Sequence, residues 1–154
     1  MELKRATVND AGAIWHMQRE AFSDLLDKYR DYETNPACET AEQAEARLLQ
    51  PYTYFYYIAE DNNTVGAVRV VDKKDGSPKR ISPVFIMKEF RNRGYAQKAI
   101  AEAENIHGHS LWELETILQE KGNCHLYEKM GYRQTGRTRV INERMTLVSY
   151  EKNN

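Results

Sequence analysis

The spacing of hydrophobic residues divides the chain into a helical first third and a strand-rich remainder. A short strand is predicted at residues 2–7, and Asn9 or Asp10 can cap the helix that follows. An apolar stripe with steps of seven, four and three residues indicates one face of that helix. Its members are Trp15, Phe22, Leu26 and Tyr29. After a loop at Asn35-Pro36, Thr40 and Gln43 form the capping-box pair of a second helix, which Pro51 ends.

From residue 54 onward the period becomes that of strands. Strand-like runs cover residues 54–59, 65–71, 81–87, 111–117, 132–141 and 145–150, with helices between them at 96–106 and 124–130. Pro83 lies inside the 81–87 run and has no N–H to donate, so a bulge or a gap in pairing is expected there. The order of elements predicts a single α+β domain over residues 1–152. Its central sheet is mixed, with about six to seven strands, and about four helices flank it.

Composition and charge narrow the function classes. The chain has 154 residues with 22 Lys plus Arg against 23 Asp plus Glu, a formal net charge of −1. That balance argues against a nucleic-acid binder that depends on phosphate charge. No apolar run reaches the roughly 18 residues that a membrane span needs, and the N-terminus has no signal-peptide core. The two cysteines, Cys38 and Cys124, are far apart in sequence, and a cytoplasmic location is the default expectation. No metal site is expected, because His107 and His109 lack further ligands at suitable spacing.

The segment Arg91–Ala96, with the pattern R-x-x-G-x-A, lies between a predicted strand and a predicted helix. The first turn of a helix offers unpaired N–H groups and the positive end of the helix dipole, which favour a phosphate. Gly94 and Ala96 are small enough to let a phosphate approach the backbone, and Arg91 and Arg93 add positive charge. The pattern is neither a Walker loop nor a GxGxxG fingerprint. An ordinary strand-to-helix turn with solvated arginines is the alternative interpretation.

A second motif follows some thirty residues later, in the segment 126–132 with the sequence LYEKMGY. Together, in this order and at this separation, the two motifs resemble those of the GNAT superfamily of N-acetyltransferases. The resemblance covers nearly the whole chain, because the order of elements also agrees. Residues 29–40 and 79–87 look like one branch of bacterial GNAT proteins whose substrate is unknown.

The resemblance implies a GNAT fold whose sheet splays open between its fourth and fifth strands, residues 81–87 and 111–117. Acetyl-CoA would bind in that opening, with its pyrophosphate on the backbone of the 91–96 loop. The implied cofactor residues are Phe85, Ile86, Met87, Arg91, Asn92, Arg93, Gly94, Tyr95, Ala96, Gln97, Asn123 and Tyr127. The resemblance also favours a homodimer.

The implied reaction is direct attack of an amine on the thioester. Tyr127 occupies the position of the tyrosine near the cofactor sulfur, and a phenol can protonate a leaving thiolate. Packing as a plain aromatic residue is its alternative role. A backbone N–H near Ile86 could stabilise the oxyanion. Glu113 and Glu115 are candidate bases, although surface strand glutamates or a water relay would also account for the pattern.

The acceptor pocket is expected between the first two helices. Trp15, Tyr29, Tyr32 and Glu33 could hold an ammonium group by cation–π and charge contacts, although a helical stripe of this kind is more often part of the core. Arg69 could reach a substrate carboxylate or pair with a neighbouring acid. The sequence therefore predicts an acetyl-CoA-dependent N-acetyltransferase acting on a small-molecule or peptide amine. A non-catalytic acyl-CoA-binding module is the alternative, and neither nucleic acid nor a membrane is expected as a partner.

Overall fold

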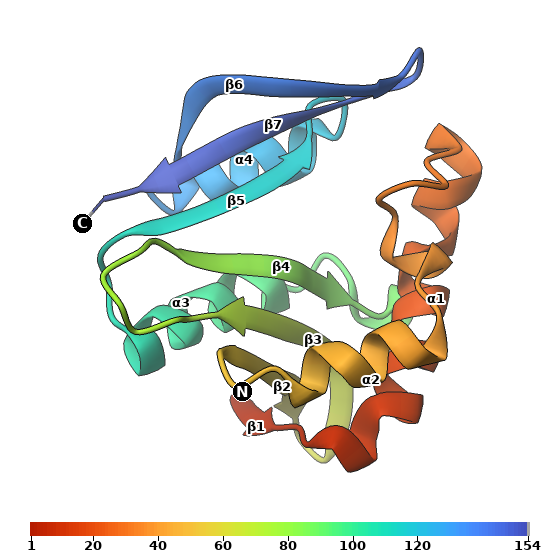
Figure 1. Ribbon diagram of the computed structural model, residues 1–154, viewed down its shortest axis with the longest axis vertical. Coiled ribbons are helices and arrows are strands. Elements are labelled where there is room, and N and C mark those ends of the chain that lie inside the picture. Colours follow the sequence, from red (N-terminus) through yellow and green to blue (C-terminus); the bar gives the residue numbers. More distant parts are fainter. Residues whose placement is uncertain (154) are drawn as a thin grey trace.

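A seven-stranded mixed sheet forms the centre of the computed structural model, which describes residues 1–153 (Figure 1). Its strands lie in the order β1-β2-β3-β4-β5-β7-β6. Their bounds are β1 Glu2–Arg5, β2 Thr53–Glu60, β3 Asn63–Val71, β4 Lys79–Ile86, β5 Trp112–Ile117, β6 Arg133–Asn142 and β7 Met145–Lys152. Every neighbouring pair is antiparallel except β4 and β5, which are parallel. The predicted mixed sheet is confirmed.

Helices cover both faces of the sheet. Their bounds are α1 Ala11–Tyr29, α2 Ala41–Leu49, α3 Tyr95–His107 and α4 Lys121–Lys129. One buried cluster joins α3 and α4 to the sheet, for example Ile100 to Val68, and another joins α1 through Ile14 and Ala21 to Phe55. Alternate strand residues point to opposite faces, so β2, β3 and β4 each supply residues to both clusters. None of the helices in the described part of the chain combines the length and the hydrophobicity that crossing a bilayer would require.

The helix starts differ in detail from the sequence-based expectations. Asp10 does occupy the position before α1, but its carboxylate accepts from the N–H of Thr7 at 2.8 Å instead of capping α1. The side chain of Thr7 caps the short turn that precedes the helix. The capping box of Thr40 and Gln43 at α2 is confirmed. Helix α4 begins at Lys121, three residues earlier than the apolar pattern indicates, because its first turn is polar.

The sheet opens between β4 and β5, as predicted. The two strands pair only at Lys79–Trp112 and Arg80–Glu113, and beyond these pairs they diverge (Figure 1). The register of β3 with β4 also shifts between Val68 and Val70, which leaves one extra residue in β4 next to Pro83. The bulge expected from this proline is therefore present.

Gly66 on β3 allows the C-terminal end of β4 to lie close to the β3 backbone. A Cβ at this position would lie 2.1 Å from the carbonyl oxygen of Phe85. Since real Cβ contacts are never that short, only glycine allows the two backbones to approach here. The segment that borders the opening in the sheet is thus fixed from its β3 side.

Candidate active site

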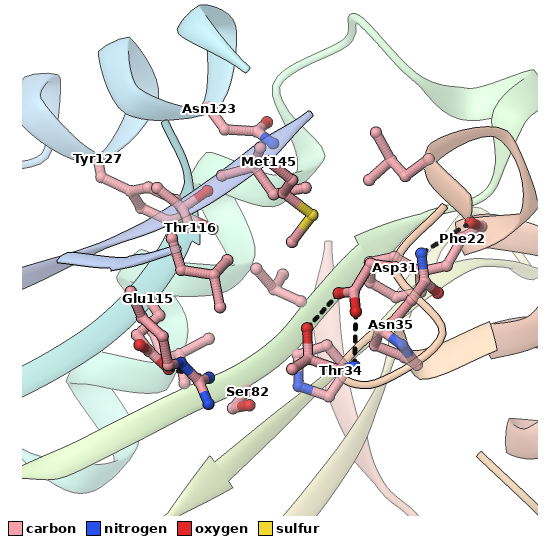
Figure 2. Close-up of a pocket in the computed structure, with 18 of the residues that line it drawn as sticks. Phe22, Asp31, Thr34, Asn35, Ser82, Glu115, Thr116, Asn123, Tyr127 and Met145 are labelled. Atoms are coloured by element: carbon pink, nitrogen blue, oxygen red, sulfur yellow. Dashed lines mark hydrogen bonds and ion pairs between the residues drawn. The ribbon is translucent and has the colours of Figure 1, made fainter. Parts of the chain in front are cut away.

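Two adjoining cavities occupy the opening between β4 and β5. The first, here called the loop cavity, has a volume of about 630 Å³ and lies against the 91–97 segment, α1 and α4. The second, the central cavity, has a volume of about 270 Å³ and is shown in Figure 2. Both are lined by the same five residues, Phe22, Leu25, Val84, Asn123 and Tyr127. A ligand in the loop cavity can therefore meet a second ligand in the central cavity at these side chains.

The 91–97 segment presents unpaired N–H groups to the loop cavity. Gly94 precedes α3 with a φ of 79°, in the left-handed region that favours glycine. The first backbone bond of the helix is donated by Lys98 to Gly94 at 3.1 Å, so the N–H groups of residues 95–97 have no helical acceptor. This turn can accept a phosphate group on its backbone.

Arg91 and Arg93 take different positions beside this turn. The Arg91 guanidinium donates to the carbonyls of Ile86 at 2.9 Å and Ala21 at 2.8 Å, and so links the end of β4 to α1. The guanidinium of Arg93 lies over the ring of Phe90, 5.9 Å from its centroid. Arg91 therefore holds one wall of the loop cavity in place, and Arg93 does not line that cavity.

The backbone of β4 offers a hydrogen-bond donor to the opening. The N–H of Met87 donates to the carbonyl of Val65 on β3 at 2.8 Å. The backbone N–H groups of successive strand residues point to opposite edges of the strand, so the N–H of Ile86 points away from β3. No residue of β5 pairs with β4 at this level. The Ile86 N–H is consequently available to an oxygen atom of a ligand in the opening.

Tyr127 on α4 borders both cavities and is 8% exposed. Its ring packs 6.1 Å from the rings of Tyr132 and Tyr150. Those two hydroxyls donate to Glu104 and Glu128, whereas no described residue bonds the hydroxyl of Tyr127. Burial raises the pKa of Tyr127 to about 12, and the nearby Cys124 adds to the shift. Its phenol is therefore protonated at neutral pH and free to donate.

Glu115 on β5 borders the central cavity, and Figure 2 shows it below Tyr127. Its Oε1 accepts from Arg80 at 3.0 Å and from Arg139 at 3.3 Å. No described residue bonds its second oxygen, which is free to accept a proton. Glu113, two residues earlier on the same strand, lies outside this cavity and only 3.8 Å from Arg80. Of the two glutamates, Glu115 alone reaches the space next to Tyr127.

The loop between α1 and α2 forms the opposite wall of the central cavity. Asp31 is buried and accepts from the N–H group of Glu33 at 3.0 Å. It also accepts from the N–H group of Thr34 at 2.8 Å, as Figure 2 shows. The hydroxyl of Thr34 also donates to it. Asn35 donates to the carbonyl of Phe22 at 3.5 Å. These bonds fix the loop against α1 and give the cavity a defined polar side.

Glu120 borders the loop cavity at the C-terminal end of α1. Its carboxylate accepts from Lys28 at 2.7 Å and from the hydroxyl of Tyr29. Burial raises the pKa of Glu120, but the bonds from Lys28 and Tyr29 outweigh this and leave it below its usual value. The ends of α1 and α4 are thereby tied together across the cavity.

Most of the cofactor residues predicted from the sequence converge on the loop cavity. Those that line it are Phe85, Ile86, Arg91, Asn92, Gly94, Tyr95, Ala96, Gln97, Asn123 and Tyr127. Met87 and Arg93 do not line it. The structure thus brings ten residues from three separate segments of the chain to one cavity.

The five predicted acceptor residues are dispersed. Trp15 donates to the carbonyl of Glu39 at 2.7 Å and borders neither cavity, and Tyr29 packs with Met145 and Leu147. The other three line a third cavity of about 290 Å³, here called the Arg69 cavity; they are Tyr32, Glu33 and Arg69. This cavity lies beside the central cavity, on the other side of the loop that joins α1 and α2.

Several residues of the site could not be found in the sequence. Arg80, Thr116, Arg139 and Met145 line the central cavity but belong to no recognisable motif. Asp31 has a local signal, since an Asp three residues before a Thr is typical of a side-chain-stabilised turn. Nothing in that pattern shows that the turn borders a cavity.

A turn of open N–H groups beside the split in the sheet suits a ligand that carries phosphate groups, as an acyl-CoA does, and points to the class of acyl-CoA-dependent acyltransferases. The sequence matches the Acetyltransferase (GNAT) family over residues 13–132, so the chain belongs to that family. As an enzyme of this family it uses acetyl-CoA as its acetyl donor, and the loop cavity fits that donor through its open N–H groups and its size.

Solved structures of N-acetyltransferases share the fold of this chain. The spermidine N-acetyltransferase of Vibrio cholerae, in complex with CoA and spermine, is 16% identical, with a TM-score of 0.76 and coverage of 99% of this chain and 94% of that one. The PaiA N-acetyltransferase of Thermoplasma acidophilum, in complex with coenzyme A, is 13% identical, with a TM-score of 0.73 and coverage of 99% and 98%. The ribosomal-protein-alanine N-acetyltransferase of Brucella melitensis is 15% identical, with a TM-score of 0.73 and full coverage of both chains. No curated protein sequence matches the chain.

Proposed function

We propose that this enzyme transfers the acetyl group of acetyl-CoA to the primary amine of a small molecule or peptide, by direct attack. The observation that carries the proposal is the hydroxyl of Tyr127. It borders both cavities and has no bonding partner among the described residues. Although the residue as a whole is buried, its hydroxyl oxygen is not among the fully enclosed unpartnered atoms of the described residues, so the hydroxyl is accessible to a ligand that enters the cavities.

When bound, acetyl-CoA supplies a thioester whose carbonyl carbon the neutral amine attacks and whose thiolate leaves. The turn at residues 92–97 would hold the pyrophosphate through its N–H groups. The N–H of Ile86 would donate to the carbonyl oxygen as negative charge develops on it. The phenol of Tyr127 would donate its proton to the leaving sulfur.

Proton removal from the acceptor is assigned to Glu115. Glu115 lines the central cavity, where the amine would lie, and one oxygen of its carboxylate has no bonding partner among the described residues. The two arginines that bind the other oxygen keep the carboxylate in place. The amine could transfer its proton to Glu115 directly or through one water molecule.

The Vibrio cholerae neighbour was crystallised with spermine, and this supports testing polyamines first among small-molecule acceptors. The Brucella melitensis neighbour is named for a protein substrate, which supports including peptides with a free N-terminus. Thiol release from acetyl-CoA is the measurement, run over polyamines, amino acids, amino-acid amides and short peptides. Turnover above the hydrolysis background with at least one amine is expected.

The same assay separates an enzyme from a binding module. Calorimetry with CoA should show binding at micromolar or tighter affinity. If CoA binds but none of the amines releases thiol, the acetyl-transfer proposal is wrong and the acyl-CoA-binding alternative is supported.

A further inference from the structure

Arg69 on β3 is a buried cation that faces a cavity. Its residue is 6% exposed, and its Nε donates to the carbonyl of Ser82. The guanidinium lines the Arg69 cavity. Within residues 1–153, no group accepts a hydrogen bond from its two terminal nitrogens, so four of its five N–H donors are unused.

The other arginines around these cavities all have carboxylate partners. Arg47 lies 2.5 Å from Glu39, and Arg80 and Arg139 share Glu115 at 3.0 Å and 3.3 Å. Glu39 is further occupied by Gln18, which donates to it at 3.2 Å. Glu33 also lines the Arg69 cavity, but it is exposed and no ion pair joins it to Arg69. Glu39 is near enough to offset part of the charge of Arg69, but no carboxylate of the described residues forms an ion pair or hydrogen bond with it.

Burying an arginine without a counter-charge is unfavourable. Burial lowers the pKa of Arg69 to about 10, and the nearby charge of Arg47 lowers it further. The fold accepts this cost in the middle of a strand whose other residues are apolar or glycine from Val65 to Val71. A planar guanidinium with free terminal nitrogens matches the two oxygens of a carboxylate.

The Arg69 cavity and the central cavity touch. They share Thr34, Asn35, Pro36, Ser82 and Pro83, the loop after α1 and the bulged part of β4. We propose that Arg69 binds the carboxylate of the acceptor, so that the substrate is a small amine that also bears a carboxylate, as an amino acid does. The amine would then lie in the central cavity near Glu115 and Tyr127. This inference rests on the acetyl transfer proposed above and narrows its acceptor.

Matched substrates test the assignment directly. Amino acids and their carboxamides differ only in the charged group, so thiol release is measured for each pair with the full-length enzyme. The acid should exceed its amide by about tenfold or more in kcat/KM, as expected for a hydrogen-bonded charge pair. Arg69→Gln should remove that preference, mainly through KM on the acid, and should change kcat/KM on the amide by less than about twofold.

Two further variants keep the result interpretable. Arg69→Lys retains the charge without the planar fork and should fall between wild type and Arg69→Gln. Arg137→Gln removes an exposed arginine on β6 that lines neither cavity, and it should keep the full preference. A wild-type enzyme that uses amides as well as acids, or an Arg69→Gln enzyme that still prefers acids, would overturn the assignment of Arg69.

Failure of the proposed acetyl transfer would look different, because the wild-type enzyme would then not release thiol with any of the amines tested. In that case calorimetry with N-acetyl amino acids in the presence of CoA decides the role of Arg69. Binding that weakens about tenfold in Arg69→Gln supports a carboxylate site. Equal affinity for both proteins, or no binding to wild type, refutes it.

Discussion

Replacing Tyr127 by phenylalanine removes the proposed proton donor and little else. The hydroxyl has no partner among the described residues, so no protein hydrogen bond is lost. The free energy of unfolding should therefore change by no more than about 0.5 kcal/mol. Affinity for CoA should also stay within about twofold, because the phosphate turn and β4 are untouched.

The effect on turnover should be large. A positioned acid contributes roughly 100-fold to 10,000-fold to a rate, so kcat of Tyr127→Phe should fall by at least about 100-fold. Thiol release at saturating acetyl-CoA and acceptor measures kcat, calorimetry measures CoA affinity, and urea unfolding measures stability. Because the pKa of Tyr127 is about 12, its loss by ionisation should not lower the wild-type rate below about pH 11.

Tyr132→Phe is the matched control. Its hydroxyl donates to Glu104 at 3.1 Å, and Glu104 keeps its second partner Lys152 at 2.8 Å. This variant should lose about 1–3 kcal/mol of stability and retain kcat within about threefold. If Tyr127→Phe keeps kcat within threefold as well, or if it loses CoA affinity in proportion to activity, Tyr127 is not the acid.

Three further predictions concern backbone and pH. Gly66→Ala should lower the free energy of unfolding, measured in urea, by about 1–3 kcal/mol, because its Cβ would overlap the Phe85 carbonyl. Gly12→Ala, in open space on α1, should leave that free energy unchanged or raise it. Equal stability of the two variants would refute this. Gly94→Ala should raise KM for acetyl-CoA several-fold and leave kcat unchanged at saturation, since a φ of 79° costs a side chain about 1–2 kcal/mol; an unchanged KM would contradict it. His107 has its pKa lowered by burial, against the opposing pull of Asp72, so the folded state binds its proton less readily than the unfolded state. Stability should therefore fall as pH drops through about 6.5, and His107→Gln should show a shallower fall between pH 7 and pH 5; equal slopes would count against it.

The sequence predicted the sheet well, and it also singled out residues that the fold brings to one cavity, for physical reasons. Strand alternation is local, and a proline inside a strand breaks pairing wherever that strand lies, so the bulge at Pro83 followed from one residue. The phosphate turn is likewise local, since Gly94 and the first turn of α3 are adjacent in the chain. That the segments 85–97 and 123–127 act together was implied by the family resemblance, and the structure places both at the loop cavity.

The acceptor side depends on contacts between distant segments. Arg80 and Arg139 meet at Glu115 although 59 positions separate them, and no local pattern encodes that meeting. Trp15 fits an aromatic-pocket pattern, yet its indole is used to hold the carbonyl of Glu39. Which side chains line the central cavity and the Arg69 cavity depends on the loop after α1. Hydrophobic periodicity does not predict the path of that loop.

The brevity of the contact between β4 and β5 has a consequence for folding cooperativity. Only two residue pairs join the four-stranded half of the sheet to the three-stranded half, so the two halves can separate by breaking few backbone bonds. The ion pair of Arg80 with Glu115, the tie between Lys28 and Glu120 and the buried cluster that contains Tyr127 are further contacts across the divide. A ligand bound between the two halves contacts both and should couple their unfolding. Its binding should therefore slow amide hydrogen exchange in both halves of the sheet.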